Sequence, residues 1–285
     1  MRYWTYEEAF KRNLGLINPY EQEKLRHTRV SVAGAGGVGG IHLATLARMG
    51  IGNFTIIDPD TFDVVNTNRQ YGATLSGIGR PKAQVMAEVI KDINPQINVS
   101  PLCVSLCPEN MSLFLEDADL VVDSLDAFET DLRRQMYRSA AEAGIPVFSA
   151  GPVGFGTAWL AFDPDGMSFD DYFALKDGMS PLRQFSHFIA GVSPVFFHRE
   201  YVDPSYLNLE EQTGPCVSSA CQLAAGVVAS DVVKYITGRG RIRYAPCFGQ
   251  FDPYLGKFVK GKLRWGNRGP IQRLKCLMIE RIIRG

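Results

Sequence analysis

Four closely spaced glycines, Gly34, Gly36, Gly37 and Gly39, form the motif in this sequence that is best suited to chemistry. They follow a short apolar run that ends at Ala33, and a helical pattern comes after them. Glycines at this point let backbone N–H groups and the start of a helix approach a phosphate, because no side chain holds it away. The motif therefore predicts a loop that binds the phosphates of a nucleotide.

An acidic residue stands where such a loop needs one. Residues 54–57 form a second apolar run, which ends on Asp58, 19 residues after Gly39. In a strand–loop–helix–strand unit, a carboxylate at the tip of the second strand accepts a hydrogen bond from a ribose hydroxyl. A tight strand-to-helix turn without a ligand is the alternative. The order of strand, glycines, helix, strand and Asp58 favours nucleotide binding.

Polar residues shortly after Asp58 distinguish the sequence from a dehydrogenase. The run Asn66-Thr-Asn-Arg69-Gln70 follows it closely, and Lys82 opens the next predicted helix. The helix dipole disfavours a cation at a helix N-terminus unless an anion lies beside it. We therefore expect a polyphosphate near Lys82, and an exposed first-turn lysine is the alternative.

Two further charged residues extend this set. Asp126 follows the predicted strand 120–123, at the carboxyl edge of the sheet where ligands bind, and Arg12 lies in the N-terminal helical segment. With Arg69, Lys82 and the glycines they could hold an ATP triphosphate and its Mg²⁺, whereas NAD needs no such cluster. Surface ion pairs for the arginines and a helix N-cap for Asp126 remain alternatives.

Other aspartates near the motifs match no functional position as firmly. We expect a structural role for Asp60, Asp63 and Asp123.

The longer pattern resembles the adenylate-forming superfamily of ubiquitin-activating enzymes. Its parts are Leu-Ala-Arg-Met-Gly-Ile-Gly, Ile-Ile-Asp, Asn-Thr-Asn-Arg-Gln, Arg-Pro-Lys-Ala-Gln-Val-Met-Ala-Glu and Ile-Asn-Pro. The superfamily includes bacterial adenylyltransferases of sulfur-carrier proteins and the tRNA threonylcarbamoyladenosine dehydratase, which the pattern resembles most. The resemblance covers residues 10–160 strongly and 215–238 weakly.

The resemblance implies a role for each matching residue. Asp58 would bind the ribose and Asp126 would hold Mg²⁺. In many relatives the arginine that matches Arg12 reaches across a homodimer interface. The residues implied to hold the phosphates and stabilise charge on the α-phosphorus are Arg12, Asn66, Arg69, Gln70 and Lys82.

Two cysteines flank the start of a long predicted helix at 217–236. Relatives with a sulfur-transfer or conjugation step use a cysteine in or after the preceding crossover. Because a helix N-terminus lowers the pKa of a thiol, Cys216 is a better candidate nucleophile than Cys221. Packing of a small residue at a helix start is the alternative for both. No C-x-x-C pair occurs, so a structural zinc site is not expected.

Composition indicates a globular protein with no strong global field. The 285 residues are 46% hydrophobic and 21% charged, and the formal net charge is zero. There is no apolar run of 18 residues and no signal-peptide pattern, so we expect a cytoplasmic protein without stable membrane insertion. Six cysteines in a chain of this length do not indicate a disulfide scaffold.

Strands and helices that alternate along the chain must position these residues. This alternation predicts an α/β fold with a Rossmann-like, doubly wound, mainly parallel sheet, then a crossover segment and a C-terminal hairpin plus helix. We expect strands at 30–33, 54–57, 97–104, 120–123, 146–150 and 158–162, and the hairpin around 248–260. We expect helices at 41–49, 82–93, 109–116, 128–143, 217–236 and 271–283, and a broken helix over 5–27.

The predicted organisation is a single adenylation domain over residues 1–285. Residues 28–160 would form its nucleotide-binding half, 163–215 a crossover or lid, and 216–285 its C-terminal half. Segment 163–215 lacks a clear period, and short helices near 179–189 and 205–211 are the expectation. Residues 5–27 are expected either over the nucleotide end of the first strand or against a neighbouring subunit.

The C-terminal helix is expected to pack on the sheet or on a second subunit through a stripe of apolar residues. Residues 257–285 hold nine Lys or Arg and one Glu, so RNA or an anionic membrane is an alternative partner. The stripe consists of Ile271, Leu274, Leu277, Met278 and Ile282.

The predicted function is ATP-dependent adenylation of a carboxylate with release of pyrophosphate. The first candidate substrate is the C-terminus of a ubiquitin-like or sulfur-carrier protein, and the expected assembly is a homodimer. A tRNA threonylcarbamoyladenosine dehydratase reaction is the first alternative. An NAD-dependent oxidoreductase and a non-catalytic nucleotide-binding scaffold are further alternatives.

Overall fold

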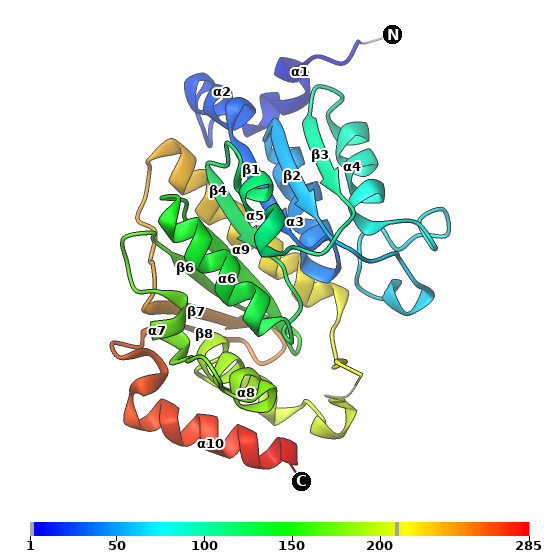
Figure 1. The fold of residues 1–285 in the computed structure, drawn as a ribbon. Helices are drawn as coiled ribbons and strands as arrows, with labels where there is room; N and C mark the ends of the chain where they lie inside the picture. The colour runs from blue at the N-terminus through cyan, green and yellow to red at the C-terminus, as the bar shows by residue number, and fades with distance from the viewer. Residues whose placement is uncertain (1–2, 209–210, 285) are drawn as a thin grey trace. The chain divides into compact units, whose positions relative to one another are not determined.

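A computed structural model describes residues 3–208 and 211–284 (Figure 1). The chain divides into two compact units. The first comprises Met1–Ser124 and Ala225–Ile242, and the second comprises Leu125–Ala224 and Arg243–Gly285.

The chain forms an eight-stranded sheet, in which the strands of the first unit are parallel and follow the order β3-β2-β1-β4. The register places Ala33 beside Ile57 on one side and Asp123 on the other, so three strand ends meet just before the glycines. The strands are β1 (Arg29–Ala33), β2 (Asn53–Ile57), β3 (Asn98–Leu102) and β4 (Leu120–Asp123).

Helices cover both faces of these parallel strands (Figure 1). Ser31 Oγ donates to the carbonyl of Phe114 in α5 at 2.7 Å, so Ser31 points to the face that α5 covers. Because side chains alternate along a strand, Val30 and Val32 point to the opposite face, where α3 packs on β1. The helices of this unit include α3 (Gly37–Met49), α4 (Lys82–Ile93) and α5 (Pro108–Leu115).

The predicted broken helix at the N-terminus is confirmed as α1 (Tyr6–Phe10), η1 (Lys11–Asn13) and α2 (Pro19–His27). Asn18 caps α2 by accepting from the N–H of Glu21 at 2.9 Å, and Pro19 occupies the first helical position, where its missing N–H is harmless. The short η2 (Val64–Asn66) lies between β2 and α4.

Antiparallel strands form the second unit, in the order β5-β6-β7-β8. A short turn with Gly154 at φ +62° joins β5 to β6, and so short a connection requires antiparallel neighbours. The predicted hairpin is confirmed in β7 and β8. The strands are β5 (Val147–Val153), β6 (Gly156–Phe162), β7 (Cys247–Asp252) and β8 (Lys257–Lys262).

The segment between β6 and α9 builds much of the second unit's core. Aromatic rings of α7 pack on one another and on β6, with ring centroids 4.5 Å apart for Phe169 and Phe173 and 5.8 Å for Phe162 and Tyr172. Residues 163–208 contain α7 (Phe169–Phe173), α8 (Pro181–Val192), η3 (Phe197–Glu200) and η4 (Pro204–Tyr206). The predicted helix near 205–211 is shorter here, and residues 209–210 lie outside the description.

Three remaining helices agree in position with the prediction: α6 (Thr130–Glu142), α9 (Ser218–Thr237), which has residues in both units, and α10 (Pro270–Arg284). The short η5 (Gly266–Arg268) was not predicted.

The prediction that the apolar stripe of α10 packs on the sheet of the same chain is wrong, and packing on a second subunit stays a prediction. Ile271 and Leu274 of the stripe are 70% and 59% exposed, and the other three members are exposed as well. The helix packs on α8 through a different face, on which Cys276 is buried and Gln272 Nε2 donates to the carbonyl of Ala190 at 2.8 Å. Polar side-chain bonds therefore select the buried face, and apolar periodicity does not reveal them.

None of the described helices combines the length and apolar character that crossing a membrane requires.

Candidate functional site

The glycine loop connects β1 to α3 in a conformation that requires glycine at two positions. Gly34 has φ +90°, which side chains of L-residues rarely adopt. A Cβ on Gly39 would lie 1.9 Å from the carbonyl oxygen of Gly34, so Gly39 allows helix and strand to approach closely. These two glycines are explained by the fold itself.

Gly36 and Gly37 stand at the open start of α3. Gly36 is the N-cap residue, and no side chain caps the helix. The first turn also carries no acidic residue. The first N–H groups of this 13-residue helix therefore lack intrahelical acceptors, which makes them an anion-binding arrangement.

Asp58 is held against the glycine loop. Its Oδ2 accepts from the N–H of Ala35 at 2.7 Å, and its Oδ1 accepts from the N–H of Asp60 at 2.9 Å. The side chain is buried, and burial raises the pKa of this carboxyl despite both hydrogen bonds and nearby Lys82. Asp58 therefore fixes the loop, and its remaining lone pairs are those that a ribose could use.

Lys82 is not an exposed first-turn lysine. It is 7% exposed, and its Nζ donates to Oδ2 of Asp60 at 2.8 Å. Its backbone N–H also donates to the carbonyl of Asp60 at 2.8 Å. An ammonium has three donors, and two of those on Lys82 have no partner among the described residues. A chain of contacts thus links the loop to Lys82 through Asp58 and Asp60.

The run after η2 places one side chain beside the loop. The Gln70 amide lies 3.5 Å from the position of a Cβ on Gly36. Gln70 is 9% exposed, and its Oε1 has no hydrogen-bond partner among the described residues. An orphan oxygen of this kind in a buried side chain is rare in native structures, and it fits a position next to a bound ligand.

Asn66 and Arg69 have different surroundings. Asn66 Oδ1 accepts from the N–H of Asp63 at 3.0 Å, while Asp63 Oδ1 accepts from the N–H of Val65 at 3.2 Å, so both residues cap η2. Arg69 bonds only to its own segment, at the carbonyl of Val65 and Oδ1 of Asn68. Within the described part of the chain it has no carboxylate partner, so the surface ion pair considered for Arg69 is absent there.

Arg12 lies far from the glycine loop of its own chain. Its neighbour Asn13 donates to the carbonyl of Met49, at the C-terminal end of α3, at 3.1 Å. Tyr6 donates to the carbonyl of Gly50 at 2.6 Å. A helix rises about 1.5 Å per residue, so roughly 18 Å of α3 separates these contacts from Gly37. Residues 5–27 therefore do not cover the nucleotide end of β1.

Asp126 belongs to the second unit, where its side chain is exposed. Its Oδ1 accepts from the N–H of Phe128 at 3.2 Å, and α6 begins only at Thr130, so Asp126 is not the N-cap. The buried Arg133 holds this loop by donating to the carbonyls of Leu125 at 2.5 Å and Asp126 at 3.1 Å.

Cys216 precedes α9, also in the second unit, and its Sγ lies 3.7 Å from Sγ of Cys221. Cys216 is partly exposed, whereas Cys221 is fully buried.

Three residues near these sites were not assigned a functional role from sequence. Asp60 was expected to be structural and proves to be the ion partner of Lys82. Arg133 holds the Asp126 loop. His42 lies in the core beside Asp123, and neither ring nitrogen has a partner among the described residues. Of these three residues, only Asp60 could have been recognised from the sequence, because it lies two residues after Asp58.

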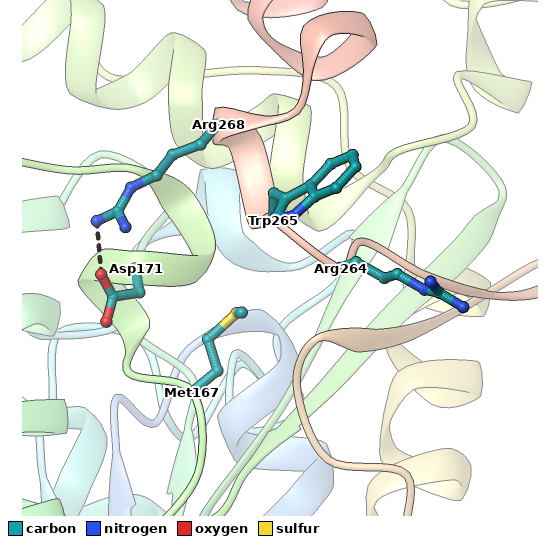
Figure 2. Close-up of a pocket in the computed structure, with 5 residues that line it drawn as sticks. All are labelled: Met167, Asp171, Arg264, Trp265 and Arg268. Atoms are coloured by element: carbon teal, nitrogen blue, oxygen red, sulfur yellow. Dashed lines mark hydrogen bonds and ion pairs between the residues drawn. The ribbon is translucent and has the colours of Figure 1, made fainter.

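A cavity of about 410 Å³ lies elsewhere, in the second unit (Figure 2). Arg268 and Asp171 form an ion pair at 2.5 Å on its wall, and Trp265 lies beside them. None of the site residues predicted from the sequence lines it, so this cavity is not the predicted nucleotide site.

No group of three or more His, Cys, Asp and Glu side chains converges on a possible metal position within residues 3–208 and 211–284. The described geometry therefore offers no ready-made cluster of these side chains. It is compatible with Mg²⁺, which is commonly held by one or two carboxylates together with substrate phosphates.

Parallel strands, an open glycine loop and an anchored acidic residue define a Rossmann-type nucleotide-binding class of protein. Comparison with known proteins narrows the class. Residues 10–266 match the ThiF family, so the chain belongs to this family.

The chain spans about half the length of two curated relatives that it matches. The tRNA threonylcarbamoyladenosine dehydratase of Haemophilus influenzae is 40% identical over 127 residues, which are 44% of this chain and 49% of that protein. The sulfur carrier protein adenylyltransferase of Thermus thermophilus is 37% identical over 131 residues, which are 45% of this chain and 48% of that protein.

Solved structures share the fold over most of the chain. A structure of E. coli MccB with SeMet MccA aligns with a TM-score of 0.70 and 19% identity, covering 95% of this chain and 75% of that one. E. coli tRNA N6-threonylcarbamoyladenosine dehydratase, TcdA, aligns with a TM-score of 0.59 and 22% identity, covering 81% of this chain and 95% of that one. At these identities the likeness concerns the fold alone.

Proposed function

We propose that this protein adenylates a carboxylate with ATP and releases pyrophosphate. The observation that carries the proposal is the connected set at the glycine loop, in which Asp58 joins Ala35 to Asp60 and Asp60 joins Lys82. An open helix N-terminus and a buried ammonium with two unused donors suit a polyphosphate. Membership of the ThiF family supports the same reaction, because relatives are named as adenylyltransferases.

The chemistry needs electrostatic stabilisation more than proton transfer. A carboxylate oxygen attacks the α-phosphorus, and negative charge grows on the surrounding oxygens. Fixed N–H groups of α3, the ammonium of Lys82 and the guanidinium of Arg69 would stabilise that charge. No general base is required, because the carboxylate is already ionised at neutral pH.

Mg²⁺ would neutralise phosphate charge and help to orient the triphosphate. Asp126 is its proposed ligand, because its carboxylate is exposed and only Oδ1 accepts a hydrogen bond among the described contacts.

The proposed substrate is the C-terminal carboxylate of a ubiquitin-like or sulfur-carrier protein, and Cys216 is the proposed nucleophile of any later acyl transfer. The cytoplasm is the proposed compartment.

A tRNA threonylcarbamoyladenosine dehydratase reaction is a second candidate function. The 40% identity to the Haemophilus influenzae dehydratase and the basic composition of residues 257–285 favour it.

A homodimer is proposed, with Arg12 contributed to the site of the partner subunit. The position of Asn13 at the far end of α3 supports this arrangement, because the loop of the same chain is out of reach.

ATP–pyrophosphate exchange tests the function when it is run with carrier-protein tails and with tRNA as separate substrates. Arg69→Ala and Asp126→Ala should each lower exchange by about a hundredfold or more, as expected for lost transition-state electrostatics. Arg29→Ala, which changes an arginine far from the loop, should exchange at the wild-type rate.

ATP with Mg²⁺ should also raise the melting temperature, and NAD should not. Stabilisation by NAD alone would contradict adenylation and favour the oxidoreductase.

A further inference from the structure

Two thiols meet at the start of α9 in the second unit. Sγ of Cys216 and Sγ of Cys221 are 3.7 Å apart. A disulfide bond is about 2.05 Å long, so each sulfur would need to move by roughly 1 Å or less. Rotation about the Cys216 side chain can supply much of this movement, because Cys216 lies before the helix and is partly exposed.

The two cysteines differ in access to solvent. Cys216 is partly exposed, whereas Cys221 lies inside α9 and is 0% exposed. An external reagent therefore reaches Cys216 first, and Cys221 is positioned to react only with Cys216. One accessible thiol and one buried neighbour are the arrangement that thiol–disulfide exchange requires.

The other four cysteines offer no such pair among the described residues. Cys103 is exposed, and Cys107 and Cys247 are partly exposed, but none of them has a second Sγ within contact distance in the described part of the chain. Cys276 is buried, and burial raises its thiol pKa to about 11, which disfavours the reactive thiolate.

We propose that Cys216 and Cys221 form a reversible dithiol–disulfide pair, with Cys216 as the entry thiol and Cys221 as the resolving thiol. The oxidant is a small disulfide such as oxidised glutathione. The Cys216 thiolate attacks one of its sulfurs, a mixed disulfide forms and one glutathione thiolate leaves. The Cys221 thiolate then attacks Sγ of Cys216, which forms the internal disulfide and releases the second glutathione. Two protein thiols are oxidised, and one external disulfide is reduced to two thiols.

The internal disulfide would connect the end of the segment before α9 to the helix itself. Oxidation would also remove the thiol of Cys216 from any acyl transfer. The pair does not depend on adenylation, because its chemistry uses no ATP.

Mass spectrometry of the full chain tests the pair directly. Cleavage after Arg199 and Lys234 gives the peptide 200–234, in which Cys216 and Cys221 are the two cysteines. After incubation with oxidised glutathione and then alkylation, this peptide should carry no alkyl group. Reduction followed by a second alkylation should add two alkyl groups. Cys221→Ala should trap glutathione on Cys216, whereas Cys216→Ala should leave Cys221 unmodified.

Cys103→Ser is the matched control, and it should leave oxidation of the 216–221 pair unchanged. Melting temperatures identify any variant that misfolds, and Cys221→Ser replaces Cys221→Ala if the alanine variant does. The proposal is overturned if both cysteines of the wild-type peptide remain alkylatable while Cys103 or Cys107 takes up glutathione. It is also overturned if Cys221 is glutathionylated in the Cys216→Ala variant as readily as Cys216 is in the Cys221→Ala variant. Pyrophosphate exchange is measured separately, so loss of adenylation and loss of the redox pair are distinguishable.

Discussion

Individual glycines of the loop serve different purposes, and the atoms around each glycine show which purpose it serves. A Cβ on Gly39 would meet backbone at 1.9 Å, whereas a Cβ on Gly36 would meet only the Gln70 side chain at 3.5 Å. The first contact is impossible without movement of the strand or helix, and the second is an ordinary one. One position therefore maintains the fold, and the other is available for binding.

Gly36→Ala and Gly39→Ala should consequently have opposite effects. Gly36→Ala should lower the free energy of unfolding by about 1 kcal/mol or less, which is roughly the difference between glycine and the poorer N-cap alanine. It should nevertheless weaken ATP binding, measured by calorimetry. Gly39→Ala should destabilise the fold by about 1–3 kcal/mol or more through overpacking. Unimpaired ATP binding by Gly36→Ala would show that the loop does not approach the phosphates.

His42 makes stability depend on pH in the acid range. Burial lowers its pKa from 6.5 to about 4, although the charge of Asp123 acts in the opposite direction. The folded protein keeps the ring neutral, while the unfolded chain takes up a proton below about pH 6.5. Its contribution is therefore fully present above pH 6.5 and is lost as the pH falls towards 4, by up to about 3 kcal/mol in total.

His42→Leu should remove this part of the acid sensitivity. Denaturant unfolding of wild type and variant at pH 7.5 and pH 5 gives the comparison, and the wild type should lose more stability between the two. Parallel losses in both proteins would refute the assignment to His42.

The roles of some of these residues could be predicted from the sequence, and the roles of others could not. Gly34, Gly39 and Asp58 were predictable because the loop, the close packing and the strand tip follow from local spacing. Asp60 and Gln272 were not, because their roles depend on partners that tertiary structure brings together, such as Lys82 and the carbonyl of Ala190.

Helices and strands were easier to predict than the faces they bury. Helix α4 begins and ends at the predicted residues 82 and 93, because its apolar period is strong and Asn94-Pro95 ends it. Helix α7 was missed, because five residues are too few for a helical period to appear. The face that α10 buries within its own chain was not predicted, because it is held by side-chain hydrogen bonds such as that of Gln272 and not by the apolar stripe.

Two separate substitutions in α10 test which face of the helix is buried. Gln272→Leu should lower the free energy of unfolding by about 1–3 kcal/mol, because it leaves the buried carbonyl of Ala190 without a donor. Leu274→Gln should change it by no more than about 0.5 kcal/mol, since Leu274 is 59% exposed. Chemical denaturation measures both values. The reverse order would restore the apolar stripe as the packing face.

At the scale of the whole molecule, the position of Arg12 makes a specific prediction about assembly. Arg12→Ala and Gly36→Ala should each have low exchange activity. A mixed dimer of the two variants, purified with two different tags, should regain activity, because one site combines an intact loop with an intact Arg12. Two separately purified variants measured together without subunit exchange form the control. A mixed dimer that remains inactive would place Arg12 outside the site of the partner subunit.

The two edge strands of the eight-stranded sheet, β3 and β8, affect how the protein behaves in concentrated solution. In the strand order, β3 is the last strand of the first unit and carries Pro101, which has no N–H to offer to an incoming strand. The last strand of the second unit, β8, carries Lys257, Lys260 and Lys262. Like charges on two such edges would repel each other on approach. Proline at one edge and lysines at the other thus oppose the edge-to-edge growth by which exposed strands aggregate, and high salt would weaken only the protection given by the lysines.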